Sequence, residues 1–463
     1  MKRNLRFYLA LLFARCTALA LKLVGRKGTS MPGSWAIILC PDFIGRMPKP
    51  KTIIGVTGTN GKTTVSNLVE DVLTKNGISY CCNRIGSNVN TGIASALINN
   101  SHFFGKPKYD LAIFEMDERS SPKLYPYLTP DMLVCTNLFR DSCKRNAHAE
   151  YIFDILNREI PKSTKLILNA DDPLCSSLCP ENDRVYYGIE HLDSDKTVCE
   201  NNVNDFPLCP NCDSPLVHDV VRYHHIGRVH CEKCGYKSPT PDYLAQNVNI
   251  GEMKMTVTEK DNGGEYPLKN DSTINIYNVL TAVSVLREMG LTPEQIRTGL
   301  ESIQISETRY SEVKTPNGKR IIHHLAKAQN PIACSRAFEN VRNASGKKAI
   351  ILLLDDRLDA ARSVENKAWL YDADFEFLND DSIEQLLLVG ARHHDTYMRA
   401  LLAGIPAEKI VHMESAQEAV TKLDKKADTF FILYEMHSIS LAETIRERTL
   451  QTEWATAPAE KEA

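Results

Sequence analysis

The chain has 463 residues, with 55 Lys and Arg against 58 Asp and Glu. This length is enough for two or three domains, each with its own core. The balanced charge gives no global field for nucleic acid, so a bound anion must be held by a local site. The 14 cysteines are unlike the disulfide framework of a small secreted domain, and four of them form CxxC pairs. Composition therefore predicts a multidomain cytoplasmic protein.

An amphipathic helix is predicted within residues 1–50. Its apolar residues recur at helical spacing: Leu5, Leu9, Leu12, Cys16, Leu19 and Leu23. Lys2, Arg3 and Arg6 precede an apolar run as in a secretory signal, but Arg15 and Lys22 interrupt the run and oppose a membrane-spanning helix. Two interpretations of the apolar face stay open: packing on the body of the protein, and peripheral contact with the inner face of the membrane.

An α/β domain is predicted over residues 51–305. The apolar strand 52–57 leads into a Gly-rich turn that opens a helix near Thr63. Further short buried strands are expected at 109–114, 132–136 and 166–169, and a helix at 274–289. This alternation favours a parallel sheet covered by helices.

Two features follow the first part of that domain. A Cys-rich insertion interrupts the α/β pattern at about residues 205–240. A smaller α/β domain is predicted over residues 306–463, with strands at 349–354, 385–389 and 429–433.

A phosphate-binding loop is predicted between the strand 52–57 and the following helix. Its residues are Gly58, Thr59, Asn60, Gly61, Lys62, Thr63 and Thr64. Backbone N–H groups and the helix N-terminus bind phosphate oxygens, Lys62 reaches the terminal phosphates, and the Thr63 hydroxyl can ligate Mg²⁺. Lys62 is expected to support no core. Val56 stands where the GxxxxGK[ST] pattern has its first glycine, with Gly55 and Gly58 on either side.

Polar residues elsewhere complete the predicted nucleotide site. Glu115 follows the strand 109–114 and is the candidate carboxylate for Mg²⁺, although an ordinary acidic loop is the alternative. Asn275 and Asn278 lie near the start of the helix 274–289, where they could bind a base or phosphate, or act as capping or solvated residues.

The insertion carries a predicted zinc site. Its ligands are Cys209, Cys212, Cys231 and Cys234, two CxxC pairs with the spacing of a zinc ribbon. Four thiolates leave no open position for water, so the Zn²⁺ would be structural. Four nearby histidines are expected to be solvated loop residues: His218, His224, His225 and His230.

Nucleic-acid binding by the ribbon is not favoured. Between residues 213 and 237, the basic residues Arg222, Arg228, Lys233 and Lys237 are offset by Asp213, Asp219 and Glu232. The aromatic residues that could stack on bases are limited to Tyr223 and Tyr236. The ribbon is therefore interpreted as a structural element.

Several segments carry a family resemblance. They are GVTGTNGKTT, NRIGSNVNTGI, TNLFRD, LNADDP and NIYNVLTAVSVL, and in this order they resemble the central ATP-binding domain of the Mur ligases over about residues 51–303. The resemblance implies that Lys62 and Thr63 contact ATP and Mg²⁺, that Glu115 binds the metal, and that Asn275 and Asn278 lie by the nucleotide. It also implies carboxylate activation, in which ATP phosphorylates a carboxyl group and an amine attacks the acyl phosphate.

The ribbon followed by YKSPTPDYLAQNV resembles the MurT branch of this family. That branch works as a heterodimer with a glutaminase of the GatD type. The resemblance implies amidation of the D-glutamate α-carboxylate of lipid II to D-isoglutamine, with ammonia from the glutaminase.

The last domain resembles the MurT C-terminal region at both ends of one stretch, residues 353–357 and 369–376. Between them this sequence is longer than the family pattern, and Ser363 stands where an Asp is expected. Asp359 is the candidate to orient the catalytic histidine of the glutaminase, with Glu365 the next, and a solvated loop acid is the alternative for Asp359. By the same resemblance, Arg309 and Lys327 keep the charge expected near phosphate.

Two rival functions remain. An amino-acid-adding Mur or folylpolyglutamate ligase would use an amino acid in place of ammonia, and the ribbon counts against it. A non-catalytic scaffold would not hydrolyse ATP, and the intact phosphate loop counts against it.

Overall fold

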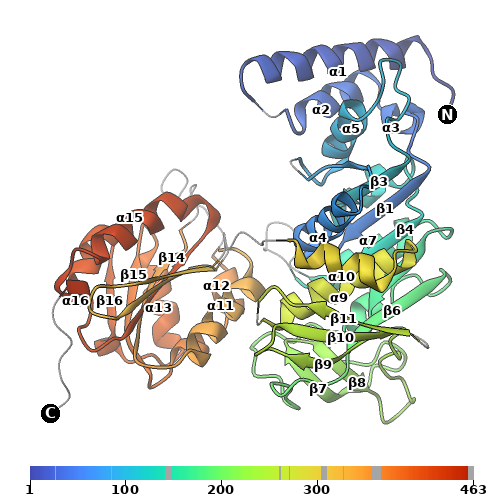
Figure 1. The fold of residues 1–463 in the computed structure, drawn as a ribbon. Helices are drawn as coiled ribbons and strands as arrows, with labels where there is room; N and C mark the ends of the chain where they lie inside the picture. The colour runs from blue at the N-terminus through green and yellow to red at the C-terminus, as the bar shows by residue number, and fades with distance from the viewer. Residues whose placement is uncertain are drawn as a thin grey trace. The chain divides into compact units, whose positions relative to one another are not determined.

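The computed structural model describes residues 1–26, 28–84, 86–140, 148–259, 262–270, 272–303, 310–326, 328–355 and 367–456. They divide into two compact units (Figure 1). The first contains most of the chain up to Ile305, and the second contains the chain from Ser306 onward together with short earlier segments such as Glu200–Val203. Each unit has its own sheet and its own apolar core.

A nine-stranded sheet forms the centre of the first unit, in the order β11-β10-β9-β6-β5-β4-β1-β3-β2. The strands are β1 (Thr52–Thr57), β2 (Cys81–Cys82), β3 (Leu111–Glu115), β4 (Met132–Cys135), β5 (Lys165–Asn169), β6 (Arg184–Ile189), β9 (Tyr243–Asn249), β10 (Lys254–Glu259) and β11 (Asn262–Pro267). From β9 to β2 in this order, every strand pairs in parallel with its neighbour. The predicted parallel sheet is confirmed there, whereas β10 and β11 add an antiparallel edge that the sequence pattern did not predict.

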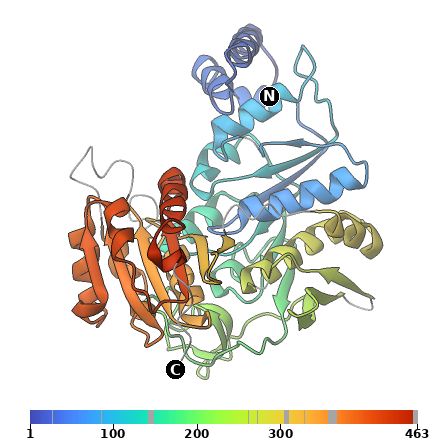
Figure 2. The same cartoon turned by 60° about the vertical axis from the view of Figure 1, so that its left-hand side comes forward.

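Most helices of the first unit lie beside this sheet, whereas the first two helices of the chain lie farther out (Figures 1 and 2). The helices of this unit are α1 (Leu5–Leu23), α2 (Met31–Leu39), α3 (Phe43–Arg46), α4 (Lys62–Lys75), α5 (Asn90–Asn99), η1 (Glu118–Ser120), α6 (Ser121–Leu124), α7 (Ala149–Glu159), α8 (Pro173–Ser176), α9 (Thr273–Glu288) and α10 (Pro293–Glu301). The α9 helix is buried along most of its length, and its N-cap Ser272 accepts a hydrogen bond from the Asn275 N–H group. Such a cap satisfies one of the free donors at a helix start.

The interpretation of α1 as packing through its predicted apolar face is wrong. The buried side chains are Phe7, Ala10, Leu11 and Ala14, on the opposite side of the helix. The small Ala10 and Ala14 side chains permit close packing against this side, and the Phe7 ring stacks on Phe43 with 5.2 Å between centroids. Among the described residues, no helix is long and apolar enough to cross a membrane.

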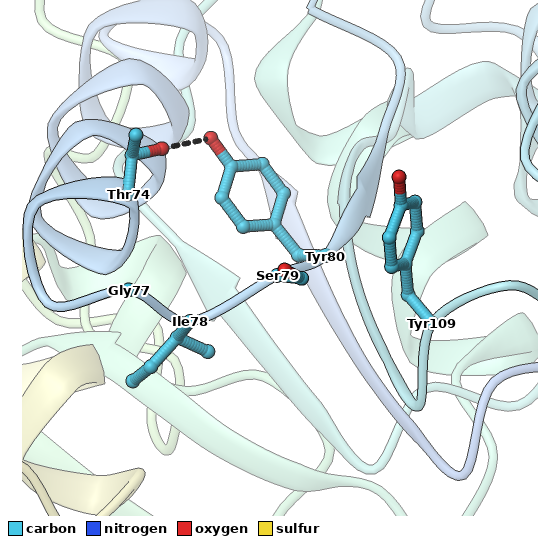
Figure 3. Close-up of a pocket in the computed structure, with 6 residues that line it drawn as sticks. All are labelled: Thr74, Gly77, Ile78, Ser79, Tyr80 and Tyr109. Carbon is cyan, nitrogen blue, oxygen red and sulfur yellow. Dashed lines mark hydrogen bonds between the residues drawn. The ribbon is translucent and has the colours of Figure 1, made fainter.

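A small pocket lies at the C-terminal end of α4 (Figure 3). Its lining residues are Thr74, Gly77, Ile78, Ser79, Tyr80 and Tyr109. The Thr74 and Tyr80 hydroxyls share a hydrogen bond of 2.9 Å. This lining has no charged side chain to bind a phosphate, and the predicted phosphate loop lies at the other end of the helix.

One buried acid in α4 predicts a pH dependence of stability. Burial raises the pKa of Glu70 to about 7, an effect only partly opposed by Arg84, whose guanidinium lies 3.7 Å away. Because the folded chain favours protonated Glu70, stability is lost as pH rises from the ordinary pKa of 4.5 towards 7. We expect Glu70→Gln to raise the free energy of unfolding at about pH 8 by up to about 3 kcal/mol, measured by urea denaturation.

The gain from Glu70→Gln should shrink as the pH is lowered towards 4.5. Glu294→Gln is the control, because Glu294 is exposed in an ion pair with Arg297. It should change stability little at any pH. A gain for Glu70→Gln that is the same at both ends of the pH range would contradict the raised pKa.

The second unit is built on a six-stranded sheet in the order β12-β13-β17-β14-β15-β16. Its strands are β12 (Tyr310–Lys314), β13 (Arg320–Leu325), β14 (Lys348–Leu353), β15 (Ile383–Val389), β16 (Ile410–Met413) and β17 (Thr429–Tyr434). Its longer helices are α11 (Pro331–Asn343), α13 (His393–Leu402) and α15 (Ile439–Thr449). Among the described pairings of this six-stranded sheet, only β12–β13 is antiparallel. The three predicted strands correspond to β14, β15 and β17.

A separate two-stranded hairpin, β7 (Val217–Tyr223) and β8 (Ile226–His230), lies in the Cys-rich insertion of the first unit. It follows β6 and precedes β9 in the chain. In Figures 1 and 2, the hairpin and the α1–α2 pair lie at opposite ends of this unit.

Candidate nucleotide site and cysteine cluster

The phosphate loop joins β1 to α4 and has glycine where only glycine fits. Gly58 and Gly61 have positive φ values of 115° and 87°. A Cβ atom at Gly58 would lie 2.3 Å from Thr136 Oγ1 and 2.9 Å from the Asn137 carbonyl oxygen. A Cβ atom at Gly61 would lie 2.6 Å from Asn278 Oδ1. The loop is therefore held close to the segment after β4 and to α9.

Gly58→Ala is expected to weaken ATP binding about tenfold or more, because the methyl group must displace Thr136 or the loop backbone. Gly77→Ala is the matched control. Gly77 also has a positive φ, of 71°, but a Cβ atom there would meet no atom within 4 Å. Isothermal titration calorimetry with MgATP should show a lower affinity for Gly58→Ala and an unchanged affinity for Gly77→Ala. Equal affinities of the two variants would contradict the close packing of the loop.

Lys62 is the first residue of α4 and lies against Glu118, a carboxylate that the sequence analysis did not select as a site residue. Its Nζ atom is 2.9 Å from Glu118 Oε1 and also donates to the Gly58 carbonyl oxygen. The same Glu118 oxygen accepts a hydrogen bond of 2.8 Å from the Gly58 N–H group. Burial favours neutral Lys62, but Glu118, with Glu115 and Asp117 further away, outweighs this effect and raises the pKa of Lys62. Lys62 is therefore a protonated residue held in place by Glu118.

The expectation that Lys62 supports no core is corrected by this contact. Glu118 is 5% exposed and its charge is balanced by Lys62. Removal of the ammonium group would leave a buried carboxylate without its partner.

The two predicted magnesium ligands lie together. Thr63 Oγ1 donates a hydrogen bond of 2.8 Å to Glu115 Oε2. The other carboxylate oxygen of Glu115 accepts a hydrogen bond of 3.1 Å from Asn88 Nδ2. A hydroxyl and a carboxylate are oxygen ligands of the type that Mg²⁺ prefers. The chemistry of the two groups therefore fits Mg²⁺.

The middle of the loop is fixed by the segment after β4. The Thr59 hydroxyl accepts from the Phe139 N–H group at 2.9 Å and donates to the Phe139 carbonyl oxygen at 3.2 Å. The Asn60 N–H group donates to Asn137 Oδ1 at 3.0 Å. Thr64 is half-buried in the first turn of α4. Asn137 and Phe139 thus shape the loop from one side.

The two predicted asparagines of α9 differ in their surroundings. Asn275 Oδ1 accepts hydrogen bonds from the N–H groups of Lys269 and Asn270, which fixes the turn before the helix. Asn278 lies against Gly61. Of the two, Asn278 is the one that contacts the phosphate loop.

The four predicted metal ligands form a compact cluster. The sulfur atoms of Cys209, Cys212, Cys231 and Cys234 all lie within 4.8 Å of one another. The Cys209–Cys234 and Cys212–Cys231 sulfur distances are 3.4 Å and 3.6 Å, and all four cysteines are free. Four thiols at this separation suit one tetrahedral zinc ion.

The expectation that His224 and His225 are solvated is wrong. Both are fully buried at the β7–β8 turn. The His225 ring lies 4.5 Å from the Phe139 ring, and the Tyr223 ring stacks on Phe139 at 5.9 Å, centroid to centroid. The His225 ring also faces a buried carboxylate, because its Nε2 atom lies 3.4 Å from Asp172 Oδ1. The β7–β8 hairpin, which lies between the two CxxC pairs, is therefore packed on the residue that fixes Thr59.

Arg222 of the same hairpin is an anchor in the protein interior. It is 1% exposed at its side chain and lies 2.9 Å from Asp171 and 3.0 Å from Asp195. Burial favours the neutral guanidinium, but Tyr277 and the two carboxylates outweigh it and raise the pKa of Arg222. Arg222 is thus committed to an internal ion pair, which agrees with the ribbon being a structural element.

Several predicted residues lie outside the described part of the chain. They are Arg309, Lys327, Asp359, Ser363 and Glu365. Glu118 is the main site residue that the sequence analysis missed. The sequence did contain a signal for this residue, because Glu118 lies three residues after Glu115 in the same acidic segment.

A phosphate loop between a parallel strand and a helix, with a smaller α/β unit after it, agrees with the class of Mur-type ligases. A model of the Mur ligase middle domain matches residues 56–206, and one of the MurT ligase C-terminal domain matches residues 327–437. The subunit MurT of lipid II isoglutaminyl synthase (glutamine-hydrolyzing) from Staphylococcus aureus (strain COL) is 32% identical over 92% of this chain and 95% of its own length. The chain belongs to the MurT family.

A second MurT subunit and two solved structures are also similar to this chain. The MurT subunit from Streptococcus pneumoniae (strain ATCC BAA-255 / R6) is 28% identical over 91% of this chain and 93% of its own. A pseudomurein peptide ligase type C from Methanothermus fervidus has a TM-score of 0.66 at 21% identity, covering 88% of this chain and 80% of its own. MurF ligase from Thermotoga maritima, solved in complex with ADP, has a TM-score of 0.57 at 15% identity. The match covers 91% of this chain and 84% of the MurF chain. These two structures show the same fold.

Proposed function

We propose that this chain is the ATP-using subunit of a glutamine-dependent lipid II amidating enzyme. The observation that carries the proposal is the phosphate loop with Lys62 paired to Glu118 and Thr63 paired to Glu115. The similarity to MurT subunits named for lipid II isoglutaminyl synthase, over nine-tenths of the chain, supports the substrate. The product would be D-isoglutamine in the stem peptide.

The proposed reaction has two steps. A carboxylate oxygen of D-glutamate attacks the γ-phosphorus of ATP, the bond to the β-phosphate oxygen breaks, and ADP leaves. Ammonia then attacks the carbonyl carbon of the acyl phosphate, loses a proton, and expels phosphate. Holding both reactants in one site makes the second step effectively unimolecular and protects the acyl phosphate from water.

The loop residues would have separate tasks. The Lys62 ammonium would bind the terminal phosphates and offset charge on the transferred group, and the N–H groups of residues 58–63 would bind phosphate oxygens. Thr63 and Glu115 would hold Mg²⁺, which offsets charge on the β- and γ-phosphates when bound. Glu118 touches the loop and would position Lys62.

We propose zinc for the cysteine cluster and a GatD-type glutaminase as the partner that supplies ammonia. The zinc would hold the ribbon whose turn packs on Phe139. A cytoplasmic location fits the free cysteines and the use of ATP.

The amine source tests this proposal against an amino-acid-adding ligase. Purified chain with MgATP and lipid II should release ADP when ammonium is added, and should not do so with any single amino acid. Glutamine should replace ammonium only when the glutaminase is present. ADP release that needs an amino acid would contradict the proposal, and no release under any condition would favour the scaffold alternative.

Asp359 is proposed to orient the catalytic histidine of the glutaminase. We expect Asp359→Ala to lose glutamine-dependent amidation and to keep ammonium-dependent amidation, because the ATP site is built in the first unit. Glu365→Ala is the comparison, and its glutamine-dependent rate should be close to that of the parent. Equal glutamine-dependent rates for the parent and Asp359→Ala would contradict this role.

A further inference from the structure

The outward side of α1 is an apolar surface that nothing described in its own unit covers. We call it the α1 face and define it as Leu5, Leu9, Leu12, Leu19 and Leu23. These leucines are between 50% and 80% exposed. They lie on one side of the helix because successive members are three, four or seven residues apart. The buried Phe7, Ala10, Leu11 and Ala14 lie on the other side. Figures 1 and 2 show α1 as the outermost helix of the first unit.

Exposed aromatic rings adjoin this face. Phe13 of α1 packs edge-on against Trp35 of α2 at 5.5 Å between centroids, and both rings are partly exposed. Phe103 and Phe104 lie at the tip of a turn closed by the Ser101–Pro107 bridge, and they are 65% and 67% exposed. Aromatic rings of this kind favour the boundary between water and lipid.

The aromatic turn is attached to α1 by arginines. Arg15 donates to the Ser101 hydroxyl at 2.9 Å and to the His102 carbonyl oxygen at 2.6 Å. Arg3 donates to the Phe104 carbonyl oxygen at 3.3 Å. The aromatic turn is therefore fixed to α1, and its Gly105 lies next to the buried Phe7 and Leu11.

The charge of this region indicates what covers the surface. Residues 1–41 contain seven Lys and Arg and no Asp or Glu, whereas the whole chain has a net charge of −3. Two copies of this face would bring like charges together. An anionic bilayer offers hydrocarbon for the leucines and phenylalanines and negative headgroups for the cations, at about 1 kcal/mol for each cation near the surface.

We infer that the α1 face docks in the surface of an anionic membrane, with α1 lying in the plane of the interface. The apolar side chains enter the acyl boundary, and the flanking cations, such as Lys22 and Arg26, meet lipid phosphates. Residues 1–41 have no acidic side chain and expose a large apolar surface. An exposed apolar patch of this kind marks an interaction site. This inference does not depend on the proposed amidation. If both hold, docking brings the phosphate loop to a lipid-linked substrate.

Tryptophan fluorescence gives a direct test. The chain has three tryptophans, and Trp369 and Trp454 are only 2% and 3% exposed, against 40% for Trp35. Vesicles of phosphatidylcholine with phosphatidylglycerol should shift the emission of the full chain to the blue, and brominated acyl chains should quench it. No nucleotide and no lipid II are added, so failure of this test and failure of the amidation test are distinguishable.

Matched variants locate the surface. Leu9→Glu combined with Leu12→Glu should weaken vesicle flotation by more than about tenfold. Leu402→Glu is the control, because Leu402 is 66% exposed in α13, and it should float like the parent. Phosphatidylcholine vesicles alone should bind less than the anionic mixture. Lys22→Glu with Arg26→Glu, which keeps the leucines, should lower binding only to the anionic vesicles.

Three results would overturn the inference. The parent chain could fail to float with anionic vesicles. The double leucine variant could float like the parent while ATP binding shows it to be folded. Self-association without lipid that disappears in the leucine variant would assign the face to a second copy of the chain.

Discussion

Replacing Lys62 with methionine, together with Glu118→Gln, is expected to lower ATP-dependent amidation about a hundredfold to a thousandfold while the chain stays folded. The paired change is needed because Lys62 balances the buried Glu118 carboxylate. Lys62→Ala alone should lose activity and also about 3–5 kcal/mol of stability, as expected when one partner of a buried ion pair is removed. Amidation rates and urea denaturation of the two variants measure both effects.

Two further variants separate phosphate binding from support of the loop. Glu118→Gln alone keeps Lys62, so it should retain much of the activity and lower the affinity for ATP through a looser loop. Lys51→Met is the control, because Lys51 is exposed and pairs with Asp110. Full amidation activity of the Lys62→Met/Glu118→Gln chain would contradict the assignment of the phosphate site.

Disruption of the proposed zinc site is the second change with a large expected effect. Cys209→Ser or Cys234→Ser should remove the single zinc ion expected per chain and lower the melting temperature, because metal binding is coupled to folding and contributes about 10–16 kcal/mol in small zinc domains. The affinity for MgATP should fall as well, since the hairpin packs on Phe139, which fixes Thr59. Metal analysis, thermal melting and ATP titration give three independent measurements.

Cys16→Ser is the control for the cluster, because Cys16 is an exposed free cysteine of α1. It should keep the zinc, the melting temperature and the ATP affinity. Freshly prepared parent protein without zinc would contradict the metal assignment. Unchanged ATP affinity in a zinc-free but folded chain would contradict the contact between the hairpin and the loop.

The parts that the sequence predicted are those with a local pattern. Residue type and spacing predict the buried strand before the loop, its glycines, and the roles of Thr63 and Glu115. In the structure, Thr63 Oγ1 lies 2.8 Å from Glu115 Oε2. The cysteine cluster is also local, because each CxxC pair lies on one turn.

The parts that the sequence analysis missed depend on packing between distant segments. Glu118 is three residues from Glu115, but only the approach of η1 to the loop makes it the partner of Lys62. His225 is buried because Phe139 lies beneath it, some eighty-six positions earlier in the chain. Both sides of α1 are apolar, so periodicity could not select the buried one.

The fate of the carboxylate oxygen tests the central proposal most directly. Lipid II carrying a heavy oxygen isotope in the D-glutamate α-carboxylate would be amidated by the chain and its glutaminase, and the released phosphate would be examined by mass spectrometry. Phosphoryl transfer to the carboxylate predicts one labelled oxygen in the phosphate for each amide formed. Amide formation with unlabelled phosphate would contradict activation of this carboxylate by ATP.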